Sequence, residues 1–173
     1  NDSAEAIYNP EKYLLYCDPF MGQFDNRVKS GDAAGYADCA ARLSRYESHA
    51  EYGYLFRSLR ALCAFLSVKA DLGIRTRAAY LSGDKKAAKA LCTDYDAALE
   101  RLDAFYAAYE QQWMRENKPQ GFDVVDLRIG GQRQRLLHCR DRLLAYAEGQ
   151  LDRIEELEEP VLDCCCEETA DGK

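Results

Sequence analysis

The densest group of charged, aromatic and glycine residues is the stretch 113–135, WMRENKPQGFDVVDLRIGGQRQR. It contains the only tryptophan, one of the four prolines and a Gly-Gly pair. Arginines and carboxylates alternate through it, so its charges can pair with one another around a loop. It holds no histidine or cysteine, and it matches no phosphate loop, nucleophile elbow or dinucleotide fingerprint. This stretch therefore predicts a packing corner rather than a catalytic centre.

Gly130 and Gly131 stand just inside the start of a predicted helix. Each glycine inside a helix costs about 1 kcal/mol relative to alanine, so two together indicate that a side chain would not fit. Two explanations stay open: the pair forms an internal corner against the preceding helix, or a second domain packs there. The residues that we assign to this interdomain packing are Trp113, Glu116, Asn117, Lys118, Asp126, Arg128, Gly130 and Gly131.

The histidines and cysteines do not form a recognisable site. The two histidines, His49 and His138, lie in different predicted elements, and neither has a metal-ligand spacing around it. Cys164, Cys165 and Cys166 adjoin one another, but three consecutive thiolates cannot reach one ion without severe backbone distortion. We therefore expect no metal and no cofactor.

The cysteine pattern also bears on the cellular compartment. A secreted disulfide scaffold would be shorter and rich in loops. Here four of the eight cysteines, Cys39, Cys63, Cys92 and Cys139, fall inside helical patterns beside apolar residues. A free cysteine behaves there as a small apolar side chain. The N-terminal residues lack the basic and apolar regions of a secretory signal. We therefore expect reduced thiols in a cytoplasmic protein.

Chain length and net charge limit the classes of function that remain. The chain has 173 residues, a net charge of −7 and a pI near 5.0, so a single acidic domain is expected. An acidic surface repels phosphate backbones and anionic lipid headgroups, which predicts neither nucleic acid nor a membrane as partner. No run of apolar residues approaches the length of a membrane span.

Apolar residues recur every three or four positions, which predicts an all-α fold. We expect an antiparallel bundle of about four long helices that follows an irregular N-terminal segment. The helices are expected from Ser30 to about Tyr46, from Leu55 to Leu81 with a kink at Gly73, from Asp84 to about Trp113, and from an N-cap at Asp126 to Pro160. Residues 13–17 are a short apolar run before Asp18-Pro19, and we expect an extended segment or a single turn.

Two strings resemble those of a known family. Residues 113–123 and 126–131 resemble the pattern W-x-x-E-N-K-P-x-G-[FL]-[DE]…D-x-R-x-G-G of bacterial exo-β-N-acetylhexosaminidases of glycoside hydrolase family 20, of the sort found in streptococci. Residues 15–25, LYCDPFMGQFD, resemble the L-W-N-D-P-L-L-G-x-F-D segment that joins the catalytic barrel of that group to a helical C-terminal domain. The two strings cover both ends of the chain, and the helices between them match mainly in pattern.

The resemblance implies a parent enzyme that removes terminal N-acetylhexosamine by substrate-assisted retaining hydrolysis. An adjacent Asp-Glu pair on a barrel strand supplies the protein's reacting groups in that family. This sequence contains no Asp-Glu dipeptide, and a barrel needs at least about 200 residues. The resemblance therefore implies a non-catalytic domain, with residues 1–28 as the end of the barrel and a linker, 29–160 as the helical bundle and 161–173 as a flexible acidic tail.

The resemblance also suggests a contact with sugar. In that family a Trp-x-acid motif lines the sugar pocket, and Tyr16 and Asp18 stand at the corresponding positions, with Cys17 between them in place of Asn. The implied role of Tyr16 and Asp18 is to contact the terminal sugar in the full-length parent. The alternative is that Asp18 only caps the turn before Pro19.

Three function classes follow from these observations. The first is an accessory domain that packs on its own catalytic barrel, and the wide apolar stripes add a homodimer as a second expected partnership. The alternative is a free-standing helical module that binds a protein partner. An independent enzyme is the third class, and no motif favours it.

Overall fold

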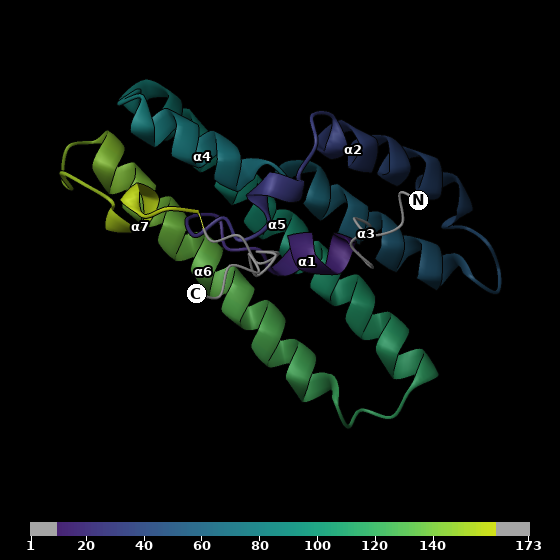
Figure 1. Cartoon of the computed structure of the whole chain (residues 1–173). Coiled ribbons are helices and arrows are strands. Elements are labelled where there is room, and N and C mark those ends of the chain that lie inside the picture. Colours follow the sequence, from purple (N-terminus) through teal and green to yellow (C-terminus); the bar gives the residue numbers. More distant parts are fainter. Residues whose placement is uncertain (1–9, 162–173) are drawn as a thin grey trace, which may run out of the picture.

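A computed structural model describes residues 10–161 of the chain (Figure 1). Every regular element in this part of the chain is a helix, which confirms the all-α prediction. The elements are α1 (Pro10–Tyr16), η1 (Asp25–Arg27), α2 (Asp32–Leu43), η2 (Ser44–Tyr46), α3 (Gly53–Lys69), α4 (Leu72–Leu81), α5 (Lys85–Glu116), α6 (Phe122–Ala147) and α7 (Glu155–Glu158). Cys164, Cys165, Cys166 and almost all of the predicted acidic tail lie outside the described residues.

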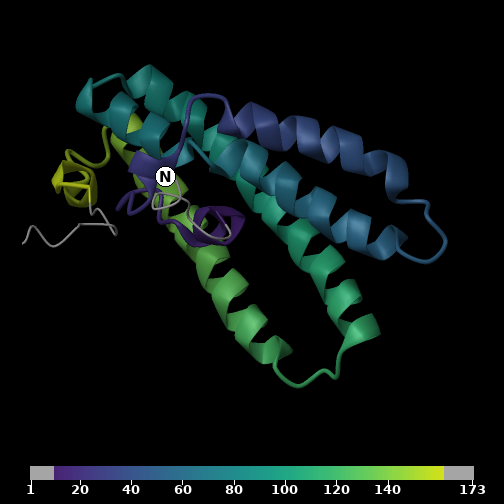
Figure 2. The same ribbon diagram turned by 45° about the vertical axis from the view of Figure 1, so that its right-hand side comes forward.

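Helix α5 is the axis of the bundle. It contacts α3, α4 and α6, and Figure 2 shows α5 and α6 as the two arms of a long hairpin, with α3 against α5 and α2 outside α3. The helix begins as expected at Asp84, whose Oδ1 accepts a hydrogen bond from the Ala87 amide at 2.9 Å. Tyr95 is fully buried in the N-terminal half of α5, and its hydroxyl lies 3.1 Å from Thr76 Oγ1 on α4. The buried residues of α5 run from Ala88 to Phe105, so the core forms around the N-terminal two-thirds of this helix.

The N-terminal segment differs from the expectation. Residues 10–16 form the helix α1, so the prediction of an extended segment or a single turn for 13–17 was wrong. A short apolar run before a proline fits a strand or a helix equally well, and tertiary contacts decide between them. Leu14 and Leu15 are buried in the main core, and Phe20 just beyond them has no exposed surface. This segment is therefore packed into the bundle.

The expected helix from Leu55 to Leu81 is two helices. α3 ends at Lys69 and α4 begins at Leu72, so the chain breaks before Gly73 instead of kinking at it. A Cβ atom at Gly73 would lie 2.9 Å from the carbonyl oxygen of Pro19. Glycine is required there because the backbone of the N-terminal segment passes directly over the first turn of α4.

Helix α6 begins earlier than predicted. Gly121 occupies the N-cap position with a left-handed φ of 96°, and Phe122 is the first helical residue. Asp123 Oδ1 accepts a hydrogen bond from the Gly121 amide at 3.0 Å, which fixes this start. Asp126 therefore lies inside the helix and is not its N-cap, and its Oδ1 accepts a hydrogen bond from the Tyr106 hydroxyl at 2.7 Å. Glycine's freedom at positive φ outweighed the usual preference for an acidic cap.

Helix α6 also ends earlier than predicted. It stops at Ala147, because Gly149 takes a left-handed φ of 74° and the Gln150 amide donates to the Ala145 carbonyl at 2.8 Å. The chain then reverses, and Ile154 and Leu157 are fully buried on the return. The apolar residues after 150 thus belong to a separate segment that closes the core at α4.

No described helix combines the length and the apolar content that a bilayer span requires.

Gly73 and Gly131 are a matched pair for testing these glycine assignments. We expect Gly73→Ala to lower the free energy of unfolding by about 1–3 kcal/mol, because the new methyl group collides with the Pro19 backbone. Gly131→Ala is the control: nothing lies within 4 Å of a Cβ there, so the substitution should raise stability by up to about 1 kcal/mol. Urea unfolding of both variants measures this, and equal effects would contradict the close approach at Gly73.

Candidate functional site

The residues that the sequence assigns to sugar contact lie in a segment held by three cations, of which Lys69 is buried and Arg77 and Arg135 are half-buried. The Lys69 side chain is only 3% exposed, and its Nζ donates to the carbonyl oxygens of Cys17 at 2.6 Å and Leu14 at 3.4 Å. These are carbonyls of the last turn of α1 and the residue after it, where a cation is favourable. Burial lowers the pKa of Lys69. The ammonium therefore holds the end of α1 against α3.

Asp18 is held by a second cation. Arg135 of α6 donates from Nε to Asp18 Oδ2 at 2.6 Å and from a terminal nitrogen to Oδ1 at 3.2 Å. Oδ1 also accepts the amides of Phe20 at 2.8 Å and Met21 at 3.1 Å. Both carboxylate oxygens thus have partners within this chain, and the turn-capping role of Asp18 is present. The Arg135 guanidinium completes its pairing with Glu156 Oε1 at 3.3 Å.

A third cation joins the two ends of the described chain. Arg77 of α4 donates to the carbonyl oxygens of Phe20, Leu157 and Glu159. One guanidinium therefore bridges the loop after α1 and the segment that contains α7. The three cations place the segment from Tyr13 to Asp25 in one fixed position over α3, α4 and α6 (Figure 1).

Tyr16 lies at the end of an apolar groove. The groove has a volume of about 530 Å³ and opens between α3 and α6 above α5. We call it the α3–α6 groove, and its principal lining residues are Leu15, Tyr16, Leu55, Leu59, Leu62, Phe105, Tyr109, Val124, Val125, Arg128 and Ile129. Ser58 and Gln112 add the remaining polar groups. Burial raises the pKa of the Tyr16 phenol although the nearby Arg128 acts against this, so the hydroxyl stays protonated at neutral pH.

Part of the predicted interdomain set is used inside the domain. Trp113 Nε1 donates to the Lys118 carbonyl at 2.8 Å, and its ring packs against Phe122 at a centroid distance of 5.7 Å. The Asn117 amide donates to the Trp113 carbonyl at 2.8 Å and ends α5. These contacts close the hairpin loop between α5 and α6.

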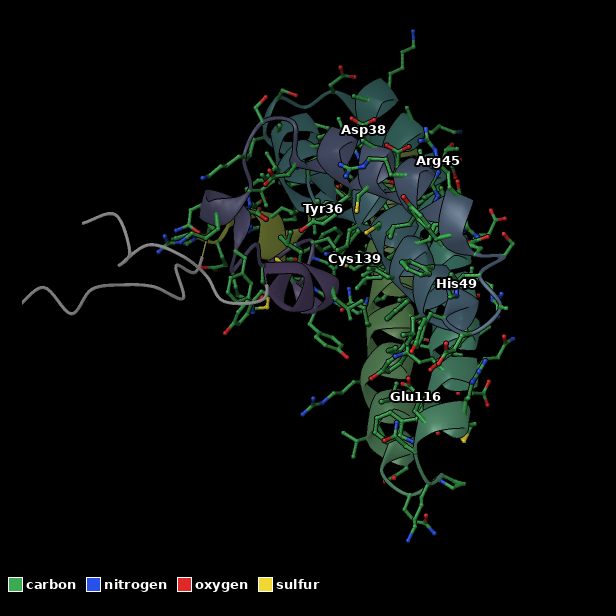
Figure 3. The ribbon with its side chains drawn as sticks, turned by 90° about the vertical axis from the view of Figure 1, so that its right-hand side faces the viewer. Tyr36, Asp38, Arg45, His49, Glu116 and Cys139 are labelled. Atoms are coloured by element: carbon green, nitrogen blue, oxygen red, sulfur yellow. The ribbon has the colours of Figure 1, made fainter. Side chains whose placement is uncertain are left out.

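Glu116 and Asp126 also have partners on neighbouring helices. Glu116 Oε1 accepts the Tyr54 hydroxyl of α3 at 2.6 Å, and Figure 3 shows Glu116 toward the hairpin end of the bundle. Asp126 accepts the Tyr106 hydroxyl, and this bond raises the pKa of Tyr106 to about 12. Both carboxylates therefore tie helices of this domain together.

The other three residues of that set face outward. Arg128, Gly130 and Gly131 are exposed on α6, and nothing within the described chain lies within 4 Å of a Cβ at either glycine. The internal-corner explanation for the glycine pair is therefore wrong for the described residues. Packing of another body against this face stays a prediction.

The histidines and cysteines take structural roles. His49 Nδ1 accepts the Glu51 and Tyr52 amides in the turn before α3, and His138 is exposed on α6. Figure 3 labels His49 in the turn between η2 and α3 and Cys139 in the interior, where burial raises the pKa of its thiol to about 12. Such a thiol is unreactive at neutral pH. No group of three metal-ligating side chains exists among residues 10–161.

Comparison with known proteins identifies the family. The family model described as "Glycoside Hydrolase 20C C-terminal domain" matches residues 1–173, which is the whole chain. The chain belongs to this family. The resemblance to glycoside hydrolase family 20 is thereby confirmed, whereas the streptococcal type of subgroup stays a prediction. A search of curated proteins found no match.

Sequence reasoning on this glycoside hydrolase 20C C-terminal domain missed the cations that hold the site. Lys69 occupies an apolar stripe of α3, and a charged residue in a core-facing stripe is a signal of buried pairing. Arg77 and Arg135 carry no comparable signal, because arginines are common on helix surfaces. Their carbonyl and carboxylate partners come from distant parts of the chain, which spacing cannot show.

The Asp18–Arg135 pair predicts a pH-dependent contribution to stability. Burial raises the pKa of Asp18, but hydrogen bonds from Arg135, Phe20 and Met21 outweigh this and lower it below the ordinary value of 3.8. The stabilisation is thus fully present above the unfolded-state pKa and is lost as the pH falls through the lower folded-state pKa. We expect Asp18→Asn to cost about 2 kcal/mol at pH 7, with the difference from wild type shrinking below pH 3.8.

Asp103→Asn is the control for that measurement. Asp103 also pairs with an arginine, Arg133, at 2.7 Å, but both side chains are about half exposed. An exposed pair contributes about 0–1 kcal/mol. Urea unfolding between pH 2.5 and 7 compares the variants, and a pH-independent loss in Asp18→Asn would contradict the ionic role.

Proposed function

We propose that this chain is the non-catalytic C-terminal domain of a β-N-acetylhexosaminidase and that it packs on the enzyme's catalytic barrel. The match of the family model to the whole chain carries the proposal. It is supported by the sequence, which has no Asp-Glu dipeptide for substrate-assisted hydrolysis. It is also supported by the carboxylates Asp18, Glu116 and Asp126, whose partners lie within the domain. The parent enzyme would act on terminal N-acetylhexosamine in glycans.

We place the parent enzyme in the cytoplasm and include a homodimer in the proposal. The free thiols of Cys17, Cys39, Cys92 and Cys139 support a reducing compartment. Large exposed apolar side chains such as Tyr46 and Leu81 support self-association. Light scattering at several protein concentrations measures the oligomeric state. A molecular mass that stays that of a monomer at every concentration would refute the homodimer.

The alternative function, a free-standing helical interaction module, makes a different prediction for activity. Under our proposal this chain alone does not hydrolyse a chromogenic N-acetylglucosaminide, whereas the full-length parent does. Deletion of the domain from the parent should lower the temperature of enzyme inactivation, because the barrel loses its packing partner. Hydrolysis by this chain alone would refute a non-catalytic role. An unchanged inactivation temperature would favour the free-standing module.

The proposed sugar contact of Asp18 requires a comparison with Arg135. Both Asp18→Asn and Arg135→Gln break the same ion pair, and an asparagine oxygen can still accept the Phe20 and Met21 amides. Arg135→Gln also removes the pairing with Glu156, so it should disturb the segment at least as much as Asp18→Asn. If Asp18 also accepts a hydrogen bond from the terminal sugar, Asp18→Asn should lower kcat/KM of the full-length parent by about tenfold more than Arg135→Gln. Equal losses in kcat/KM would show that Asp18 acts only through the structure of the turn.

A further inference from the structure

The α3–α6 groove is an apolar site on the side of the domain where α1 lies, and no side chain of residues 13–161 fills it. We propose that this groove receives an apolar segment of the parent's catalytic portion, and that this segment carries a carboxylate that pairs with Arg128. The inference rests on the proposed packing of this domain on that portion, and it names the surface that makes the contact.

The walls of the groove are apolar and accessible. Leu59 of α3 is 47% exposed and Val124 of α6 is 44% exposed, on opposite sides of a floor formed by Phe105 and Tyr109. Contiguous exposed apolar surface of this kind marks interaction sites on soluble domains. α1 packs against α3 beside the groove (Figures 1 and 2), and its Leu15 and Tyr16 belong to the groove lining. The groove therefore continues a surface that already accepts an apolar helix of this chain.

Arg128 indicates which charge the docked segment carries. Among residues 10–161 its guanidinium makes no hydrogen bond or ion pair, although it is part of the groove lining. The chain carries 30 acidic residues against 23 basic ones, so a cation beside an apolar groove that has no acidic partner in the described part of the chain is distinctive. Arginine is favoured at interfaces because its planar guanidinium binds carboxylates in two-point geometry. A carboxylate on the docked segment would complete this pairing.

The outer face of α6 continues the same surface. Val124, Arg128, Gly131 and Arg135 follow one another at helical spacing, so they lie on one side of the helix. This row begins in the groove and ends at the Arg135–Asp18 pair. Gly131, in the middle of the row, leaves the backbone accessible to a neighbour, because nothing in the described chain covers it. The docked body would thus extend from the groove toward Asp18.

The connection of the chain favours the catalytic portion as the occupant over a second copy. A C-terminal domain is joined to the rest of its protein through its N-terminal side, and α1 is the first described element. Leu15 and Tyr16 at the end of α1 are part of the groove lining. A body attached ahead of α1 therefore reaches the groove without crossing the bundle, and covalent attachment keeps its effective concentration high.

Photocrosslinking in the full-length parent tests the proposal. Val124→benzoylphenylalanine places the probe in the groove, and Leu81→benzoylphenylalanine is the control, because Leu81 is 65% exposed on α4 outside the groove. Retained hydrolytic activity shows that both proteins are folded. We expect the Val124 probe to give intramolecular adducts with residues of the catalytic portion at a yield about tenfold above that of the Leu81 probe.

The other outcomes overturn the inference in distinguishable ways. Adducts from Leu81 but not from Val124 would leave packing on the catalytic portion intact and remove the groove as its site. Adducts from neither position would count against both proposals. A Val124 adduct between two polypeptides would assign the groove to a second copy, and a Val124 adduct with residues 1–9 of the same chain would assign it to the chain's own N-terminal residues.

Hydrogen–deuterium exchange with Arg128 variants tests the charge. Amides lining the groove in α3 and α6 should exchange about tenfold more slowly in the full-length parent than in this chain alone. Arg128→Glu should abolish that protection and Arg128→Lys should keep part of it, because the lysine keeps the charge and loses the two-point geometry. Full protection in Arg128→Glu would refute a carboxylate partner.

Discussion

The structure depends on the pairing of the buried Lys69 and the half-buried Arg135 with the N-terminal segment. A charged side chain taken out of water is costly unless a partner replaces its hydration. Lys69 meets this requirement with the Cys17 and Leu14 carbonyls, and Arg135 meets it with the carboxylate of Asp18. If residues 13–25 moved away, both cations would remain in the bundle without these partners. The segment and the helices are therefore one cooperative unit.

This coupling shows which parts of the fold the sequence could reveal. The start of α5 at Asp84 and the loop at Pro119–Gly121 were predictable, because a cap, a proline and a glycine act on their immediate neighbours. The helix α1 and the break between α3 and α4 were not predictable, because the residues that cause them are far away in the sequence. Lys69 stabilises the end of α1 across the core, and the Pro19 backbone crosses α4 at Gly73. Such causes leave no local pattern.

The sequence likewise revealed one part of the candidate site and not another. The string around residues 113–123 identified the family, and its contacts explain it as a structural signature: Trp113 donates to the Lys118 carbonyl and packs on Phe122. Its distinctive residue types therefore close a hairpin. The α3–α6 groove was not predictable, since its lining comes from four helices and includes ordinary leucines and valines. A groove forms where the apolar faces of neighbouring helices do not touch, so the sequence pattern of one helix cannot reveal it.

Gly130 and Gly131 lower the stability of α6, and the described part of the chain offers no contact that explains this cost. Two glycines inside α6 weaken the helix by about 1 kcal/mol each relative to alanine. At Gly73 a similar cost is explained within the domain, because the Pro19 carbonyl occupies the place of a side chain. At Gly130 and Gly131 the space is open, so no contact within the described chain offsets the cost. Packing of another body on this face of α6 stays a prediction, and it fits Arg128 on the adjoining turn, whose guanidinium has no hydrogen-bond or ion-pair partner among residues 10–161.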